Sequence, residues 1–220
     1  GQHVLAANGV ISSLTDWLDR VSGNWWFLAV ILIIALLDSV IPIVPSETTV
    51  IIGGVAASSA GAASYNVVFV IIAGAVGAFI GDNLSYQIGR RASGLVERRA
   101  AKKESTAKKL KWAADQIEER GGLLLITARF IPGGRTILTL SSGLTKQSQS
   151  WFMGWVGVAT IIWASYAAIL GYAFGSQFED DHTKAFLLAF GAALAVTLLI
   201  EVVRYGKKKL TAKATQETAV

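Results

Sequence analysis

The sequence predicts an all-α integral membrane protein, built as an inverted repeat of two re-entrant helical hairpins that are each followed by a transmembrane helix. Of the 220 residues, 53% are apolar and 16% are charged, too hydrophobic for an ordinary soluble domain. Two apolar tracts are broken by prolines and charges in corresponding places, which is typical of inverted-repeat transporters. The basic residues form two runs beside apolar segments, as cytoplasmic loops do. We expect one membrane domain over residues 1–220, with a C-terminal transmembrane helix and amphipathic surface helices.

Composition and motifs argue against several functions. The chain has no cysteine, so we expect no disulfide and no thiolate metal site. Its formal net charge of +5 comes from the two loop-like runs, so we expect no nucleic-acid partner. The two histidines, His3 and His182, lie at predicted soluble ends, and neither His-Glu-x-x-His nor Gly-x-Ser-x-Gly occurs. We therefore expect no metal, no cofactor and no enzymatic activity.

The first third of the chain predicts a surface helix followed by a hairpin. Residues 10–21 place apolar side chains at helical spacing, as in an amphipathic helix on the membrane surface. Residues 25–60 then hold two apolar arms on either side of Pro42 and Pro45. A full crossing needs about 20 apolar residues, and neither arm has them. We predict a re-entrant hairpin with the two prolines at its tip.

Residues 65–89 are the first predicted transmembrane helix. Ala73, Gly77 and Gly81 recur every four positions and predict a face that another helix can approach closely. Residues 90–120 follow as a basic loop, ending in an amphipathic helix over 108–120, and the excess of Lys and Arg places this loop in the cytoplasm.

The second half repeats this order. Residues 121–145 are apolar but broken at Pro132, Gly133 and Gly134, and each arm of about ten residues reaches only the middle of a bilayer. This predicts a second re-entrant hairpin, entering from the cytoplasm. Residues 151–175 and 184–204 are predicted transmembrane helices, and the basic tail 205–220 is predicted to be cytoplasmic. We therefore expect a multi-pass protein of the cytoplasmic membrane with its N-terminus outside.

The two hairpins carry complementary charges. In each, a charged residue is followed by Ile-Pro and then by a second charge and Thr, which supports an internal repeat. The first half supplies Asp38, Glu47 and Asp82, and the second supplies Arg129 and Arg135. An Arg in hydrocarbon costs roughly 2.5–3.5 kcal/mol, so we predict a buried anion site where the tips meet. Two alternatives stay open, namely a structural ion-pair cluster and a loop whose arginines meet lipid phosphates at the interface.

These residues resemble the DedA family of membrane proteins, also called the SNARE-associated Golgi protein family. The resemblance covers about residues 25–175. Ser142 and Ser46 depart from it, at positions where the family usually has Ala and Gly. The motifs that carry it are Pro45-Ser46-Glu47, the run from Gly77 to Asp82 with Tyr86, Gly89, Arg90 and Gly94, and Arg129 to Arg135 with Ser142-Gly143.

The resemblance implies transport of a carrier lipid, undecaprenyl- or decaprenyl-phosphate, for cell-envelope recycling, linked to the proton motive force. It implies that Glu47 and Asp82 are the functional acids and Arg129 and Arg135 the functional arginines. Since a planar guanidinium can hold two phosphate oxygens at once, we expect these arginines to bind the phosphate. The charge pattern of the first hairpin adds Asp38 to these acids, as a residue for proton coupling or ion pairing. The predicted supporting residues are Pro42, Pro45, Pro132, Gly133, Gly134, Tyr86 and Tyr166.

Other functions and roles stay open at this point. A proton-coupled transporter of small cations or solutes would use the acids alone, and a general phospholipid scramblase would use the same hairpins. Tyr86 and Tyr166 either donate to a phosphate or pack against a neighbouring helix. The expected partners are membrane lipids, with polyprenyl phosphate foremost, and protons, and the sequence leaves a homo-oligomer open.

Overall fold

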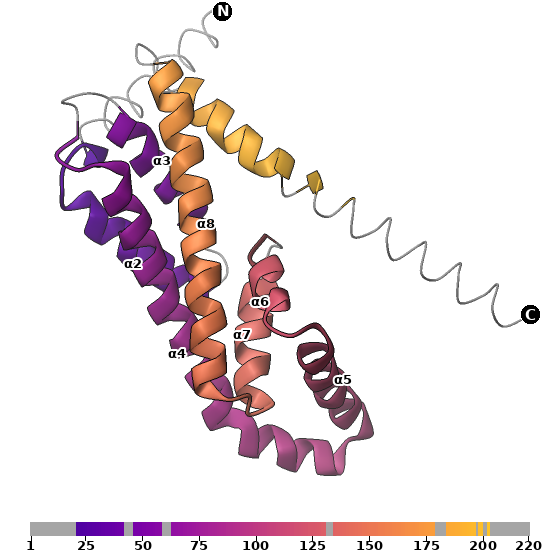
Figure 1. The fold of residues 1–220 in the computed structure, drawn as a ribbon. Helices are drawn as coiled ribbons and strands as arrows, with labels where there is room; N and C mark the ends of the chain where they lie inside the picture. The colour runs from indigo at the N-terminus through magenta and orange to yellow at the C-terminus, as the bar shows by residue number, and fades with distance from the viewer. Residues whose placement is uncertain are drawn as a thin grey trace, which may run out of the picture.

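The structure is a computed structural model that describes residues 21–41, 46–58, 63–130, 134–178, 184–196, 198–199 and 202. These residues contain helices, turns and bends but no strand, which confirms the predicted all-helical class (Figure 1). The labelled elements are α2 (Phe27–Val40), α3 (Ser46–Ser58), α4 (Val67–Lys102), α5 (Glu104–Arg120), α6 (Leu123–Thr127), the 3₁₀ turn η1 (Ala128–Phe130), α7 (Gly134–Leu144) and α8 (Gln149–Gln177).

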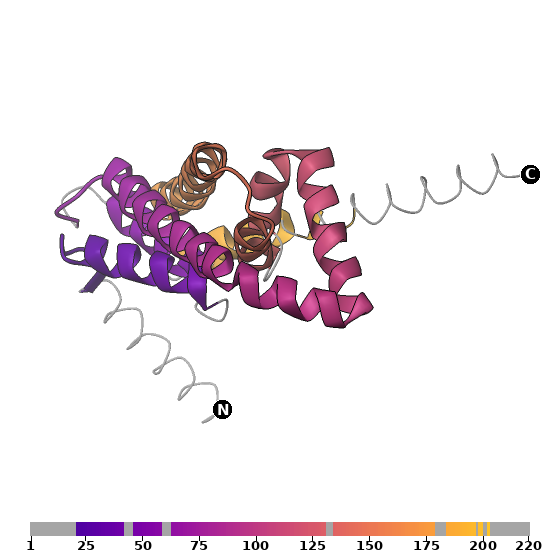
Figure 2. The same cartoon turned by 90° about the horizontal axis from the view of Figure 1, so that it is seen from below.

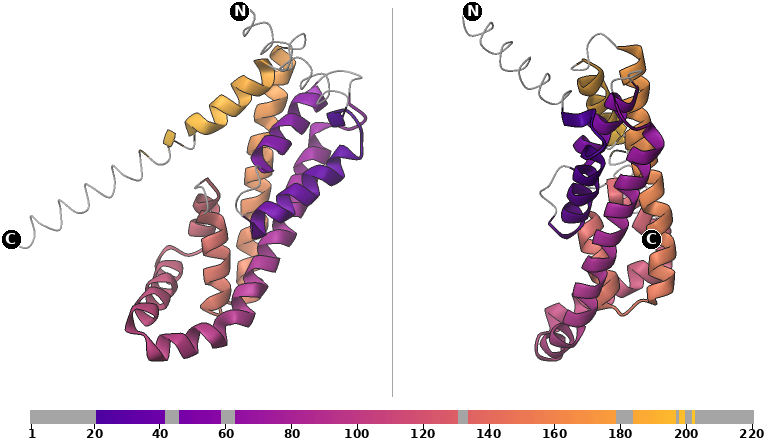
Figure 3. Two further views of the ribbon diagram at one scale, coloured as in Figure 1. Left: turned by 180° about the vertical axis from the view of Figure 1, so that it is seen from behind. Right: turned by 90° about the vertical axis from the view of Figure 1, so that its left-hand side faces the viewer.

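Two helices, α4 and α8, form the long axis of the molecule (Figure 3). They have 36 and 29 residues and are long and apolar enough to cross a membrane. Each begins at a polar cap, because Asn66 Oδ1 accepts from Val68 N–H at 3.0 Å and Ser148 Oγ accepts from Trp151 N–H at 3.3 Å. Such caps satisfy N–H groups that a helix start leaves unpaired.

The shorter helices pack in an exchanged arrangement. In the first half, α2 packs along α4 while α3 packs along α8. In the second half, α6 packs against α8 while α7 packs along α4. The second helix of each pair therefore lies against the long helix of the other half, with α3 beside one part of the α4–α8 axis and α7 beside another (Figures 1 and 3).

Glycines allow these exchanged contacts to be close. A Cβ on Gly54 of α3 would lie 2.3 Å from the Ala168 carbonyl oxygen of α8, and one on Gly143 of α7 would lie 2.1 Å from that of Tyr86 in α4. On the long helices, Gly171 of α8 lies equally close to the backbone of α3, and Gly89 of α4 lies equally close to that of α7. Gly89 follows the cap Asn66 by 23 positions, and Gly171 follows the cap Ser148 by the same number.

The helix α4 differs from its predicted extent. It continues past Gly89 to Lys102, where a loop was predicted, and α5 then begins at Glu104 instead of Lys108. Arg, Lys and Ala are strong helix formers, so the helix continues through the basic run. Figure 2 shows the end of α4 and α5 extending away from α2 and α8.

Two more segments bear on the predictions. The first arm of the second pair is only α6 and η1, preceded by Gly121 with φ 59°. In the predicted third crossing over 184–204, residues 184–196, 198–199 and 202 are helical, and the other positions lie outside the described residues. Its small residues Ala185, Ala189 and Ala193 are buried against the bundle. The predicted helix over 10–21, except for residue 21, and Pro42, Pro45, Pro132 and Gly133 lie outside the described residues.

Candidate functional site

The ends of the short helices meet beside the middle of α4 and bring the predicted charges together. Asp38 lies in the last turn of α2, Arg129 in η1 and Arg135 in the first turn of α7, while Asp82 lies inside α4. The position of Asp82 is fixed because α2 crosses α4 closely, with Gly81 under the Leu36 carbonyl oxygen. Four charges from both halves thus share one buried region.

Arg129 and Asp82 form the innermost ion pair. Arg129 Nη1 donates to Asp82 Oδ2, and the two side chains are 2% and 0% exposed. The guanidinium also lies 5.5 Å from the ring centre of Trp163 in α8, in a cation–π contact. Among the described residues, however, nothing accepts a hydrogen bond from Arg129 Nε or Nη2, and nothing donates one to Asp82 Oδ1. The buried pair therefore leaves Arg129 Nε and Nη2 able to donate to a further acceptor.

Arg135 connects the second half to both aspartates of the first. Its Nη2 lies 2.8 Å from Asp38 Oδ2, and its Nε lies 3.8 Å from Asp82 Oδ1. The Arg135 side chain is 11% exposed and the Asp38 side chain 17%, so this pair lies at a more open edge than the Arg129 pair. Ser46 Oγ, at the start of α3, donates to the same oxygen of Asp38. Asp38 thereby joins α2, α3 and α7.

Glu47 is placed differently from the two aspartates. It is half-buried at the start of α3, and no ion pair joins it to Arg129 or Arg135 within the part of the chain that the structure describes. The structure thus gives an arginine to each aspartate and none to Glu47 among the described residues.

The two tyrosines have separate surroundings. Tyr86 is buried and stacks on Phe152 with ring centres 4.5 Å apart, and its hydroxyl donates to the Gln147 carbonyl oxygen at 2.6 Å. Arg90 Nη1 donates to the same hydroxyl at 3.0 Å. Tyr86 therefore fastens the α7–α8 connection and makes no contact with the charge cluster among these interactions. Tyr166 is nearer the cluster.

Tyr166 meets the tip of the second helix pair. Its ring lies edge-on to Phe130, with centres 5.7 Å apart. Its hydroxyl donates to the Ala193 carbonyl oxygen at 3.4 Å, which ties α8 to the helix Lys184–Val196. Gly134, another predicted supporting residue, is the first residue of α7 and directly precedes Arg135.

Several residues at the site were not predicted to belong to it. Ser39 offers its carbonyl oxygen to Ser85 Oγ at 2.8 Å and to Thr136 Oγ1 at 3.4 Å, and so joins α2, α4 and α7. Ser39, Ser85 and Thr136 each lie within three positions of a predicted charged residue. That spacing could have indicated that they belong to the site. Trp163 gives no such signal, because a Trp inside an apolar helix is equally consistent with facing lipid.

The cluster has the chemistry of an anion site. Two guanidiniums lie near one pair of aspartates, and two nitrogens of Arg129, Nε and Nη2, have no acceptor in the part of the chain that the structure describes. A buried donor without a partner costs about 1–3 kcal/mol, and charge-assisted bonds to phosphate or carboxylate oxygens are the strong way to satisfy it. Fold and site together define a helical membrane protein with a buried charge cluster where its two halves meet.

Comparison with known proteins identifies the family. The VTT domain matches residues 41–173, more than half of the chain. The chain therefore belongs to the VTT-domain, or DedA, family of membrane proteins, which confirms the resemblance found in the sequence. It is 25% identical to Protein DedA of Escherichia coli K12 over 150 residues, which is 68% of each chain.

Two further relatives have different names. The inner membrane protein YohD of Escherichia coli K12 is 29% identical over 147 residues, 64% of this chain and 75% of that protein. A protein of Lactococcus lactis subsp. lactis IL1403 named alkaline phosphatase-like is 26% identical over 152 residues, 62% of this chain and 69% of that one. No solved structure gives a significant match.

Proposed function

We propose that the protein carries a polyprenyl phosphate across the cytoplasmic membrane, with its phosphate held by Arg129 and Arg135. The observation that carries this proposal is the buried guanidinium of Arg129, which lies beside a second arginine and whose Nε and Nη2 have no acceptor among the described residues. A phosphate monoester offers three acceptor oxygens and up to two negative charges. A planar guanidinium can bind two of those oxygens at once. Membership in a family of membrane proteins supports a lipid as the bearer of that phosphate.

The re-entrant architecture belongs to the same proposal. At ~1.5 Å per residue, the 11 residues of α7 extend over about half of a ~30 Å hydrocarbon core. Two helix pairs that stop there from opposite sides would meet near the midplane. The exchanged packing of α3 on α8 and α7 on α4 supports an inverted repeat, because a two-fold axis would relate these two contacts.

Proton linkage follows from competition at the cluster. Phosphate would compete with Asp82 and Asp38 for the two arginines, and a carboxylate that loses its cation binds a proton more readily. Glu47, which has no arginine in the described structure, would exchange protons without such competition. We assign the coupling to these three acids.

The arginines provide the decisive test of phosphate binding. We expect Arg129→Lys and Arg135→Lys each to keep the charge yet weaken binding of a polyprenyl phosphate in detergent by about 1.5–3 kcal/mol, roughly 10- to 150-fold. Arg120→Lys is the matched control, because Arg120 is exposed at the end of α5 and belongs to no proposed binding surface. Wild-type affinity in both site variants would remove the phosphate clamp. If a double variant with one acid and one arginine replaced by neutral residues recovers activity, the arginines serve as structural counter-ions of the acids.

A second test addresses the acids. We expect Glu47→Gln and Asp82→Asn to change the pH profile of lipid transport in liposomes, since each removes a group that exchanges a proton. The measurement is the initial transport rate over a pH series at fixed lipid content. Wild-type rates with unchanged profiles in both variants would contradict proton coupling through these residues.

The half-buried Glu47 also favours one competing function, a proton-coupled transporter of small cations or solutes, which needs acids but no arginine clamp. Lipid transport and cation flux measured in the same liposomes separate the two functions. A general phospholipid scramblase would move phosphatidylcholine and polyprenyl phosphate alike. We expect polyprenyl phosphate to be preferred, because a phosphodiester lacks the second charge that two arginines can bind.

A further inference from the structure

The exposed face of α4 changes in character along the helix. Ile80, Leu84 and Ile88 are each about half exposed, at 45%, 46% and 45%, and follow one another every four residues. Steps of three and four residues keep this face through the positions that follow. Its continuation is Arg91, Leu95, Arg98, Arg99 and Lys102, all exposed. One stripe thus runs from apolar to basic along a single helix.

The basic part of the stripe is chemically uniform. Its four cations, Arg91, Arg98, Arg99 and Lys102, form no ion pair within the described ranges. Glu97 is the one acid between residues 90 and 103 of the sequence, and it points away from the stripe, with its carboxylate 2.8 Å from Lys146 Nζ. The opposite face packs against the molecule through Gly89 and the buried Ser93. The stripe is therefore purely cationic and faces outward.

The length of α4 places this change at the membrane surface. Its 36 residues extend about 54 Å at ~1.5 Å per residue, whereas the hydrocarbon core is about 30 Å thick and takes about 20 residues. A crossing that begins at Val67 would end near Tyr86, one turn before the basic positions start. Leu95, 70% exposed among cations, lies about 13 Å beyond Tyr86 at ~1.5 Å per residue. The end of α4 turns aside from the rest of the helix in Figure 1, so it can run along the headgroup layer.

We propose that Arg91, Arg98, Arg99 and Lys102, with Leu95 inserted among them, form a binding surface for the headgroups of anionic phospholipids in the leaflet beside the end of α4. Charge complementarity selects this partner, because anionic lipid is the negative surface that an outward cationic stripe at this depth meets. The surface is separate from the Arg129 site and does not depend on which lipid is transported.

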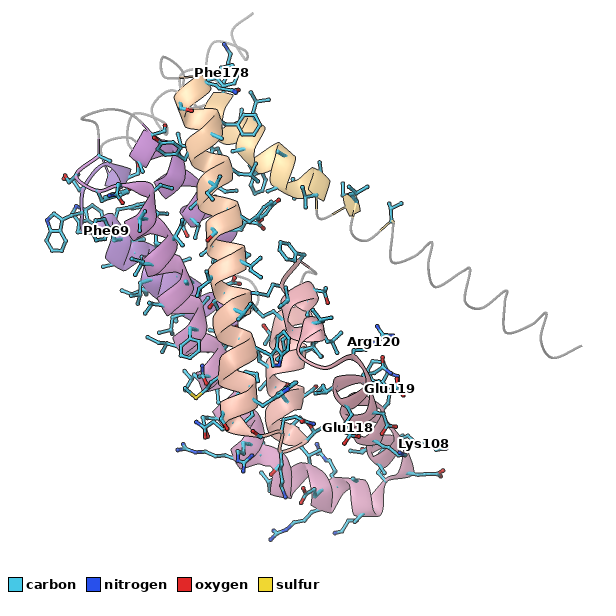
Figure 4. All side chains as sticks on the ribbon, in the orientation of Figure 1. Phe69, Lys108, Glu118, Glu119, Arg120 and Phe178 are labelled. Atoms are coloured by element: carbon cyan, nitrogen blue, oxygen red, sulfur yellow. The ribbon has the colours of Figure 1, made fainter. Side chains whose placement is uncertain are left out.

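The adjacent helix α5 supplies a built-in comparison. Lys108 and Lys111 are also exposed, but Lys108 Nζ lies 2.8 Å from Glu104 Oε1 and Lys111 Nζ lies 3.2 Å from Asp115 Oδ2. Figure 4 shows α5 with its charged side chains of both signs, including Lys108, Glu118, Glu119 and Arg120. Loss of Lys108 and Lys111 therefore removes as much positive charge as loss of two stripe residues. The lost charges, however, are ones that Glu104 and Asp115 already neutralise.

The test measures which lipid gathers beside the stripe in the full-length protein. The chain has no cysteine, so Ala101→Cys carries a single donor dye next to the stripe and Ser64→Cys carries one before α4, at its other end. Nanodiscs contain phosphatidylcholine with a minority of phosphatidylglycerol, one or the other bearing an acceptor on its acyl chain. We expect more energy transfer to phosphatidylglycerol at position 101 and equal transfer to both lipids at position 64.

Charge variants in the Ala101→Cys background decide the assignment. Each removed stripe charge is expected to lower the local enrichment of phosphatidylglycerol by up to about fivefold at low salt, the equivalent of ~1 kcal/mol. Arg98→Gln/Lys102→Gln should abolish the preference, and Lys108→Gln/Lys111→Gln should keep it. Equal loss in both pairs would overturn the proposal in favour of net charge alone, and so would an equal preference at position 64.

Salt provides a measurement that needs no charge variant. The Debye length falls from about 10 Å at 0.1 M to about 3 Å at 1 M ionic strength. The preference at position 101 should therefore disappear over this range. A preference that persists at 1 M, or that is absent at low salt, would overturn the proposal.

Discussion

At the scale of single residues, Arg129 is held from two directions and still has capacity to bind. Asp82 accepts from one nitrogen, and the Trp163 ring lies on the guanidinium from α8. Removing water from two charges costs several kcal/mol each, which their attraction repays only when the remaining hydrogen bonds are also made. Here they are not all made within the described chain. The pair is accordingly better suited to ligand binding than to stability.

This reading predicts an asymmetric response to mutation. Asp82→Ala leaves a buried guanidinium without its carboxylate and should lower the free energy of unfolding by about 3–5 kcal/mol. Replacing both partners, as in Asp82→Ala/Arg129→Leu, should recover most of that loss. Unfolding in detergent measures both variants. Glu104→Ala, which removes an exposed ion pair, is the control and should cost no more than about 1 kcal/mol. A single variant as stable as the double would contradict the prediction.

At the scale of elements, the contact between α4 and α7 depends on backbone touching backbone. A Cβ on Gly89 would lie 2.3 Å from the Leu140 carbonyl oxygen, a distance that requires the two helices to move apart. Gly94 lies in the same helix and has nothing within 4 Å of its Cβ position. The two glycines therefore separate the effect of packing from the effect of helix propensity.

Alanine at these two positions should act with opposite sign. Gly89→Ala is expected to destabilise the protein by about 1–3 kcal/mol, since it overpacks a tight contact. Gly94→Ala is expected to stabilise it by up to about 1 kcal/mol, because Ala is the better helix former and meets no neighbour. Thermal unfolding in one detergent compares them. Equal shifts in the midpoint temperature would show that the crossing of α4 and α7 is not close.

The elements also show how far the sequence could predict the structure. Apolar length identified α4 and α8, and the spacing of Gly77 and Gly81 indicated a close approach that α2 indeed makes. The complementary charges correctly indicated that the two halves meet. The pairing of Asp82 with Arg129 and of Asp38 with Arg135 could not be predicted, because it depends on how far α2 is shifted along α4. Nor could the end of α4, since basic residues mark the membrane surface without ending a helix.

At the scale of the whole molecule, each half is completed by a helix of the other. The pairs α3 with α8 and α7 with α4 are among the most extensive contacts in the described structure. The covalent connection between the halves passes through Lys103, whose backbone is extended between α4 and α5. Packing therefore holds the halves together independently of this connection.

A nicked protein tests this arrangement. Lys102 and Lys103 are exposed, so brief trypsin treatment of the folded protein should cut there. We expect the two fragments to elute as one species in mild detergent and to separate only after denaturation, because the exchanged helices keep them packed. The same nick in Gly89→Ala should weaken the association. Separate elution of the wild-type fragments would refute the exchange.

The distance of 47 residues between Asp82 and Arg129 along the chain has a consequence for biosynthesis. At about 5–20 residues per second, Arg129 leaves the ribosome roughly 2–10 s after Asp82. For the last 27 residues of that interval, roughly 1–5 s, α4 is complete to Lys102 but the Asp82 carboxylate has no cation, and lipid is a poor solvent for it. We expect α4 to wait beside the insertion machinery until the second half arrives. Formation of the ion pair would then set the time at which α4 is released into the bilayer.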